Sequence, residues 1–144
     1  MSYKLGIIGS RVSTLKGQVW NPKITNPREF VFNHMDQYVA KYGKPSKVYS
    51  GGAEGADTFG VEWADSKGIP VKKYPPSQDL IREYIKQGDS RKFAYKKAAN
   101  LRNTDIVNSS DRVVAFWDKK STGTLDTLTK AKTAKKQINV FNVG

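Results

Sequence analysis

Residues 48–64 join a short strand, a glycine turn and an amphipathic helix, and this stretch restricts the fold of the chain more than any other. The run opens with Val48 and Tyr49, a β-branched and an aromatic residue of the kind that favours strands. It turns through the small residues Ser50–Gly55 and then carries apolar residues at helical spacing. These apolar residues are Ala56, Phe59, Gly60, Trp63 and Ala64. Such a sequence places backbone N–H groups and a helix N-terminus where an anion can bind.

The glycine turn has two interpretations. Gly51, Gly52 and Gly55 permit positive φ and close approach of a ligand to the backbone, so the loop can hold the phosphate or ribose of a nucleotide-like ligand. The other interpretation is a tight connection between a strand and a helix that binds nothing. This stretch alone favours neither interpretation, and the rest of the chain has to decide between them.

Strand-like and helix-like segments alternate along the whole chain. Short apolar runs bounded by glycine, proline or polar residues predict five strands. These runs are Lys4–Ile8, Lys47–Ser50, Ile69–Tyr74, Arg112–Trp117 and Ile138–Val143. Because helical patterns separate them, we expect parallel βαβ units in a single domain, residues 1–144. The predicted fold is α/β: a Rossmann-like, doubly wound, mostly parallel five-stranded sheet with helices on both faces.

The first helix has the clearest end signals. Asn26 suits its N-cap, Pro27 its first position and Gly43 its C-terminal stop. Residues 12–26 lack periodicity and are expected to form a long loop. Within this loop Trp20 is expected to pack on the sheet edge, with a cover over a ligand as the alternative.

Three later helices are expected besides the one in residues 56–67. They span Ser90–Asn108, the stretch after Thr124 to Lys136, and a short segment around Asp79–Lys86. The apolar side of the first of these is expected to carry Phe93, Ala94, Ala98, Leu101 and Ile106 or Val107. On the second, Leu125, Leu128 and Ala131 are expected to face inward.

Composition excludes several classes of site. The chain has 144 residues, no cysteine and one histidine, so disulfides, thiolate metal sites and multi-histidine zinc sites are excluded, and no metal or cofactor is expected. No run approaches about 18 apolar residues, so no membrane contact is expected, and the predicted location is cytoplasmic. The net charge of +12 implies attraction to nucleic acid or anionic small molecules without choosing between them. Whether the chain forms a homo-oligomer stays open.

Three small-residue turns follow predicted strands, at Gly9–Arg11, Ser50–Asp57 and Ser121–Thr124. The carboxyl ends of parallel strands meet at one edge of the sheet, and ligands of doubly wound sheets bind at that edge. The convergence of three such turns therefore favours a binding site over mere connections.

Taken together, these turns resemble the SLOG superfamily of Rossmann-like domains, most closely its small stand-alone YspA-type members. The resemblance also extends, more distantly, to DNA-processing protein A and to the "lonely guy" phosphoribohydrolases. It spans nearly the whole chain, with residues 12–26 expanded. The motifs that carry it are Gly9-Ser10-Arg11, Gly-Gly-Ala-x-Gly-Ala-Asp at Gly51–Asp57, Trp63-Ala64, Arg102-Asn103 and Ser121-Thr122-Gly123-Thr124. The resemblance implies a nucleotide or nucleotide-derived ligand, such as a nucleoside phosphate or an ADP-ribose-like molecule.

The residues at these motifs suit such a ligand. Arginine forms bidentate hydrogen bonds with phosphate, and backbone amides and hydroxyls of the turns can surround it. The candidate ligand-binding residues are Gly9, Ser10, Arg11, Ser50, Gly51, Gly52, Ala53, Gly55, Ala56, Asp57, Arg102, Asn103, Ser121, Thr122, Gly123 and Thr124. No catalytic residue is assigned.

Three of these residues also have a structural interpretation. Asp57 can accept from a ribose hydroxyl, or it can simply favour the start of a helix. Arg102 can bind phosphate, or it can bond the last carbonyls of a helix. Asn103 can contact the ligand or brace a turn.

Catalysis is the less favoured expectation. The phosphoribohydrolases carry Pro-Gly-Gly-x-Gly-Thr-x-x-Glu with a catalytic glutamate, and that position is Thr127 here. Threonine cannot replace a carboxylate as general base or as a stabiliser of an oxocarbenium-like transition state. Asp126 is one residue early and points about 100° away on a helix. A hydrolytic geometry built from Glu54, Asp57 or Asp126 stays open as the alternative.

A sensor or sequestering protein for nucleotides is therefore the first functional hypothesis. Single-stranded nucleic-acid binding is the other, since a basic face and several aromatic residues could follow a phosphate backbone and stack bases. The residues concerned are Arg91, Lys92, Lys96, Lys97, Lys119, Lys120, Tyr84, Tyr95 and Trp117. A plain solvated helix face is the favoured interpretation of residues 91–97.

Overall fold

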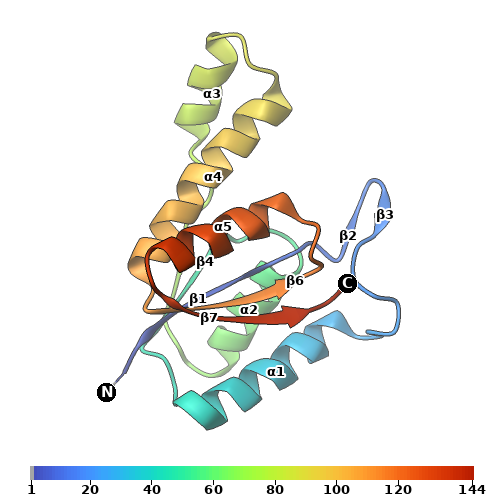
Figure 1. Cartoon of the computed structure of the whole chain (residues 1–144), viewed down its shortest axis with the longest axis vertical. Coiled ribbons are helices and arrows are strands. Elements are labelled where there is room, and N and C mark those ends of the chain that lie inside the picture. Colours follow the sequence, from blue (N-terminus) through green and yellow to red (C-terminus); the bar gives the residue numbers. More distant parts are fainter. Residues whose placement is uncertain (1) are drawn as a thin grey trace.

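The computed structural model describes residues 2–144 and confirms the predicted fold class. All four strand pairings of its five-stranded sheet are parallel, in the order β5-β4-β1-β6-β7. The strands are β1 (Lys4–Gly9), β4 (Lys47–Ser50), β5 (Val71–Lys73), β6 (Arg112–Trp117) and β7 (Gln137–Asn142) (Figure 1). Each lies where the sequence predicts a strand, although β5 is shorter than the expected Ile69–Tyr74.

Helices cover both faces of the sheet, as expected. They are α1 (Pro27–Tyr42), α2 (Ala56–Ser66), α3 (Gln78–Lys86), α4 (Arg91–Ser109) and α5 (Thr122–Thr133). Alternate residues of β6 show the two faces, because side chains along a strand point to opposite sides. Val114 and Phe116 pack with residues of α1 and α2, whereas Val113 and Ala115 pack with residues of α4 and α5.

The signals at the ends of α1 are confirmed. Asn26 Oδ1 accepts a hydrogen bond from the amide of Glu29 at 3.1 Å, and Pro27 is the first helical residue. The amide of Gly43 donates to the carbonyl of Val39 at the other end, with φ at 89°.

The expected inward positions of Phe93, Leu101 and Leu125 are wrong. These side chains are 53%, 49% and 47% exposed. The N-terminal half of α4 lies beyond the sheet and pairs with α3, so that its small residues Ala94 and Ala98 form the buried side (Figure 1). A helix that changes its packing partner half-way does not keep one apolar stripe along its whole length.

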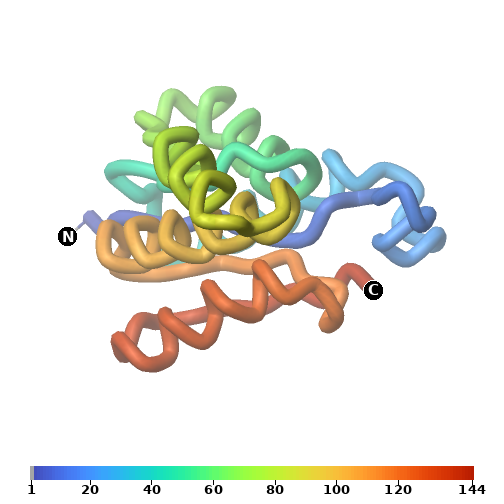
Figure 2. The backbone as a smooth tube through the Cα atoms, turned by 90° about the horizontal axis from the view of Figure 1, so that it is seen from above, coloured from blue at the N-terminus to red at the C-terminus, as the bar shows by residue number. Residues whose placement is uncertain are grey.

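Residues 12–26 are not wholly irregular. They contain a two-stranded antiparallel hairpin, β2 (Ser13–Thr14) and β3 (Gly17–Gln18), at the end of the molecule opposite the start of β1 (Figure 2). Trp20 follows the hairpin and is 1% exposed, with Nε1 donating to the carbonyl of Ser10 at 3.2 Å. Its ring packs edge-on against Phe30 and Phe59, so the packing interpretation of this tryptophan is confirmed.

Candidate functional site

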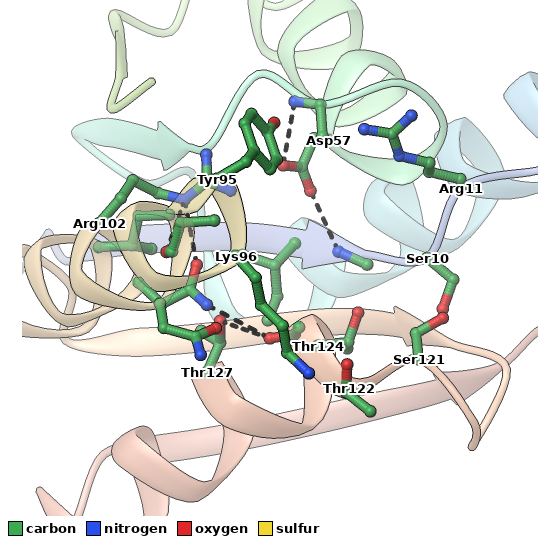
Figure 3. A pocket seen from close by; sticks show the side chains of 18 of the residues that line it. Ser10, Arg11, Asp57, Tyr95, Lys96, Arg102, Ser121, Thr122, Thr124 and Thr127 are labelled. Atoms are coloured by element: carbon green, nitrogen blue, oxygen red, sulfur yellow. Dashed lines mark hydrogen bonds between the residues drawn. The ribbon is translucent and has the colours of Figure 1, made fainter. Parts of the chain in front are cut away.

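A cavity of about 550 Å³ opens at the carboxyl edge of the sheet. Its floor lies where the turns after β1 and β6 meet, and Ser10 N donates to the carbonyl of Phe116 there at 2.8 Å. These two strands are neighbours, yet the chain leaves them in opposite directions, so this is the topological switch point at which doubly wound sheets bind ligands. The first turn of α5 and one side of α4 form the walls (Figure 3).

Asp118 joins the two turns of the floor. Its Oδ1 accepts hydrogen bonds from the Ser121 amide at 2.8 Å, the Lys120 amide at 3.0 Å and Ser10 Oγ at 3.1 Å. Burial alone would raise the pKa of Asp118, but these hydrogen bonds outweigh it and hold the pKa below its usual value. Asp118 is therefore an ionised brace that orients the hydroxyl of Ser10.

The segment Thr122–Thr124, expected as a turn, is the first turn of α5. Its N-terminus differs from those of α1, α3 and α4, where the side chains of Asn26, Ser77 and Ser90 accept from a first-turn amide. Ser121 occupies the N-cap position of α5 but makes no such bond. The first-turn amides of α5 are thus left to interact with whatever occupies the cavity.

Asp57 is a buried carboxyl that connects the glycine loop to the turn after β1. Its Oδ1 accepts from the amide of Gly9 at 3.1 Å and its Oδ2 from the amide of Ala53 at 3.3 Å. Burial raises the pKa of Asp57 to about 6, against the opposite effects of these amides and of Arg102. Both oxygens are engaged with backbone, so Asp57 holds two loops together besides lining the cavity.

The glycines of the loop make room for the protein's own atoms. A Cβ on Gly55, whose φ is 90°, would lie 2.7 Å from the carbonyl oxygen of Ser10. A Cβ on Gly51 would meet the guanidinium of Arg102 and lie 2.9 Å from Asp57 Oδ2. Gly52 has a φ of 73° and faces open space apart from the side chain of Lys73.

Arg102 braces the glycine loop from the middle of α4. Its Nη1 donates to the carbonyls of Gly51 at 2.9 Å and Tyr74 at 3.0 Å. Since α4 continues to Ser109, the interpretation of Arg102 as a helix-end residue is wrong. Asn103 connects α4 to α5 in a similar way. Its Nδ2 donates to Asp126 Oδ2 at 3.1 Å and to the Gly123 carbonyl at 3.4 Å.

The cavity brings together eleven of the sixteen candidate residues. Those that line it are Gly9, Ser10, Arg11, Ala53, Asp57, Arg102, Asn103, Ser121, Thr122, Gly123 and Thr124. The other five support it from behind or lie outside it: Ser50, Gly51, Gly52, Gly55 and Ala56. A ligand-binding role stays a prediction for every one of them.

One wall of the cavity was missed by the sequence analysis. It consists of residues of α4, among them Lys92. Tyr95 and Lys96 of the same wall are labelled in Figure 3. The sequence favours a solvated face for these residues and offers nucleic-acid binding as their alternative. The signal that identifies them as a wall is the i, i+4 spacing of Lys92 and Lys96 beside an aromatic residue. Tyr84 instead packs on the cluster of Ile81, away from the cavity.

The acidic residues considered for hydrolysis do not gather here. Asp126 pairs with Lys130 at 2.8 Å, and neither it nor the exposed Glu54 lines the cavity. Thr127 does line it, 2% exposed, with Oγ1 donating to the Gly123 carbonyl at 3.2 Å. Among residues 2–144, Asp57 is the one carboxylate in the lining.

Over residues 2–144, no three acidic or histidine side chains stand close enough together to hold a metal ion. In that part of the chain no helix has both the length and the apolar character needed to cross a membrane.

Comparison with known proteins shows the fold. No protein-family model matches the chain, and no curated protein matches it. The X-ray structure of DNA processing protein A from Streptococcus pneumoniae matches with a TM-score of 0.59 at 18% sequence identity. The match covers 96% of this chain and 50% of that one, so this chain spans half the length of that protein. The expected likeness to DNA processing protein A is thus confirmed for the fold over nearly the whole chain.

Proposed function

We propose that this protein binds a nucleotide or nucleotide-derived ligand in the cavity at the switch point, as a sensor or a sequestering protein. The observation that carries the proposal is the first turn of α5, which has no side-chain cap and whose residues Ser121 and Thr122 line a cavity that Arg11 also lines. Helix N-termini attract phosphate through free amides and the helix dipole. A volume of about 550 Å³ is in the range of small-molecule sites.

The motif resemblance to YspA-type SLOG domains supports the same ligand class. In this proposal Arg11 binds phosphate from the rim, while Arg102 and Asp57 keep the glycine loop in place. Arg11 is exposed and forms no ion pair with any residue in 2–144, so its guanidinium is available to a ligand.

Binding without hydrolysis is the form of the proposal that the lining favours. Cleavage of an N-glycosidic bond needs a carboxylate near the bond, and Thr127 stands where the phosphoribohydrolase motif has glutamate. The buried Asp57 accepts hydrogen bonds from two backbone amides and is not free to move. The ligand would then dissociate from the site without having been hydrolysed.

A thermal-shift screen with AMP, ADP, ADP-ribose and a short single-stranded DNA, at two salt concentrations, tests the proposal. A ligand that binds the native state raises the melting temperature by mass action. Arg11→Gln should remove the shift, while Arg91→Gln, an exposed residue outside the cavity lining, should keep it. Equal shifts in both variants, or none with wild type, would refute the site.

Single-stranded nucleic acid is the second candidate. The cationic side of α4 supports it, since Lys92 and Lys96 flank Tyr95, a 41% exposed aromatic that could stack a base. The similar fold of a protein named for DNA processing also supports it. Binding of this kind weakens steeply with log salt. A mononucleotide should show a much shallower salt dependence and saturate at one ligand per site.

A further inference from the structure

Two lysines of α4 line the cavity without a partner of their own. Lys92 and Lys96 are exposed, and neither forms an ion pair or a side-chain hydrogen bond with any residue in the range 2–144. Lys97, the next residue, differs in both respects. Its Nζ lies 2.9 Å from Asp89 Oδ2 and 4.4 Å from the centre of the Tyr84 ring. Asp89 precedes α4 and Tyr84 lies on α3, so the partners on this side of α4 serve the lysine outside the cavity.

The positions of these positive charges destabilise the protein when no ligand is bound. Helix α4 begins with Arg91 and Lys92 and has no acidic residue in its first turn, so cations stand at the positive end of the helix dipole. Lys92 and Lys96 are also like charges at i and i+4, a spacing that destabilises a helix. Both effects favour an anion in the cavity beside these two lysines.

The rise of α4 gives the distance along the helix axis between these lysines and the proposed anion site at α5. Asn103 Nδ2 contacts the Gly123 carbonyl at 3.4 Å, so Asn103 marks where α4 meets the first turn of α5. With a rise of 1.5 Å per residue, Lys96 begins about 10 Å and Lys92 about 16 Å further along the axis. Figure 3 shows the Lys96 side chain extending from α4 in the direction of Thr122. Lys96 thus reaches back toward the first turn of α5, whereas Lys92, about one helical turn further along α4, provides positive charge beyond the reach of a single phosphate on α5.

We infer that the ligand carries at least two phosphate groups, the first at the α5 N-terminus and the next at Lys96 and Lys92. This inference rests on the proposed nucleotide site and names its ligand class. The shared chemistry is a second phosphate on the same molecule, either in the diphosphate of a nucleoside or in the phosphodiester of a dinucleotide. Lys92 and Lys96 then select against nucleoside monophosphates.

Titration calorimetry with AMP, ADP and the dinucleotide pApA tests the inference, with GMP and GDP as a second pair. For wild type, ADP or pApA should bind about tenfold or more tightly than AMP, since hydrogen bonds to charged groups are the strong ones. Lys92→Gln/Lys96→Gln should reduce this ratio to below about threefold while AMP affinity changes little. Lys44→Gln/Lys132→Gln removes two exposed charges outside the cavity lining and should keep the ratio.

The outcomes separate this inference from the proposed function. A ratio near one in wild type, or a high ratio that survives in the Lys92/Lys96 variant, overturns the two-phosphate inference and leaves nucleotide binding standing. No binding of any of these ligands overturns both. A stronger preference for ADP than for pApA assigns the second phosphate to a diphosphate, and the reverse assigns it to a dinucleotide.

Discussion

The carboxylate of Asp57 accepts a hydrogen bond from the amide of Gly9 at 3.1 Å, although the two residues lie in different βα turns. The other carboxylate oxygen accepts from the amide of Ala53 at 3.3 Å. One buried side chain therefore sets the spacing between the turn after β1 and the glycine loop. Because burial disfavours the charged form, it raises the pKa of this group to about 6.

This pKa predicts an unusual pH dependence of stability. The folded protein keeps the Asp57 proton up to a pH of about 6, whereas the ordinary pKa is 3.8. Between these values the folded state binds more protons than the unfolded chain, so this group's contribution to stability is lost as the pH rises. A shift of this size corresponds to about 3 kcal/mol.

Urea unfolding between pH 4 and pH 8 checks the prediction. Asp57→Asn should remove most of this slope, even if it lowers stability at every pH by disturbing the two amide bonds. The exposed Asp65→Asn is the control and should keep the wild-type slope. An unchanged slope in Asp57→Asn would show that another group is responsible.

Arg102→Lys should destabilise the protein by about 1–3 kcal/mol. Lysine keeps the charge but lacks the guanidinium geometry that holds the Gly51 and Tyr74 carbonyls at 2.9 and 3.0 Å. The matched control, Arg91→Lys on the exposed side of the same helix, should change stability by less than about 0.5 kcal/mol. Chemical denaturation measures both, and equal effects would exclude a bracing role for Arg102.

Gly55→Ala should cost more stability than Gly52→Ala, although both glycines have positive φ. At Gly52 the cost is backbone strain alone, about 1–2 kcal/mol, because the nearest atom to an added Cβ is 3.6 Å away. At Gly55 the Cβ would also press on the Ser10 and Arg11 backbone at 2.7 and 2.8 Å. Thermal unfolding should rank the variants in that order, and the reverse ranking would contradict the packing between the two turns.

Local signals predict the sheet better than the cavity. The strands Lys47–Ser50 and Arg112–Trp117 have the predicted bounds, because Pro45 and the polar residues around each run limit them on both sides. The three turns meet as expected, since parallel pairing aligns the carboxyl ends of the strands. The α4 wall was not predictable in this way. The spacing of Ala94 and Ala98 places them on an apolar side of α4, but it does not reveal that α3 is the helix that covers them, and this contact sets the orientation of the wall.

The glycine loop shows a second limit of sequence reasoning. Glycines were expected to admit a ligand, yet the space beside Gly51 and Gly55 is filled by Arg102, Asp57 and the Ser10–Arg11 backbone. Contacts between segments far apart in the chain produce the same glycine pattern as a ligand would. The pattern located the turn correctly without revealing what lies against it.

Wild-type protein should release no free base from nucleoside 5′-monophosphates. Thr127 lines the cavity where the phosphoribohydrolase motif has its glutamate, and it donates to the Gly123 carbonyl within α5. Chromatography of AMP and GMP after long incubation measures the free base. Release of base that persists in Asp57→Asn would show that a group other than the lining carboxylate performs the hydrolysis.

Two serines at helix N-caps should respond differently to removal of the hydroxyl. Ser90 accepts from the Phe93 amide at 3.2 Å, so Ser90→Ala should cost about 1 kcal/mol of stability and leave ligand affinity unchanged. Ser121 makes no capping bond, so Ser121→Ala should cost less stability and instead weaken nucleotide binding severalfold. Chemical denaturation and calorimetry on the same two variants test whether Ser90 acts in stability and Ser121 in binding. If Ser121→Ala loses stability like a capping serine and binds nucleotide normally, the Ser121 hydroxyl is not part of the anion site.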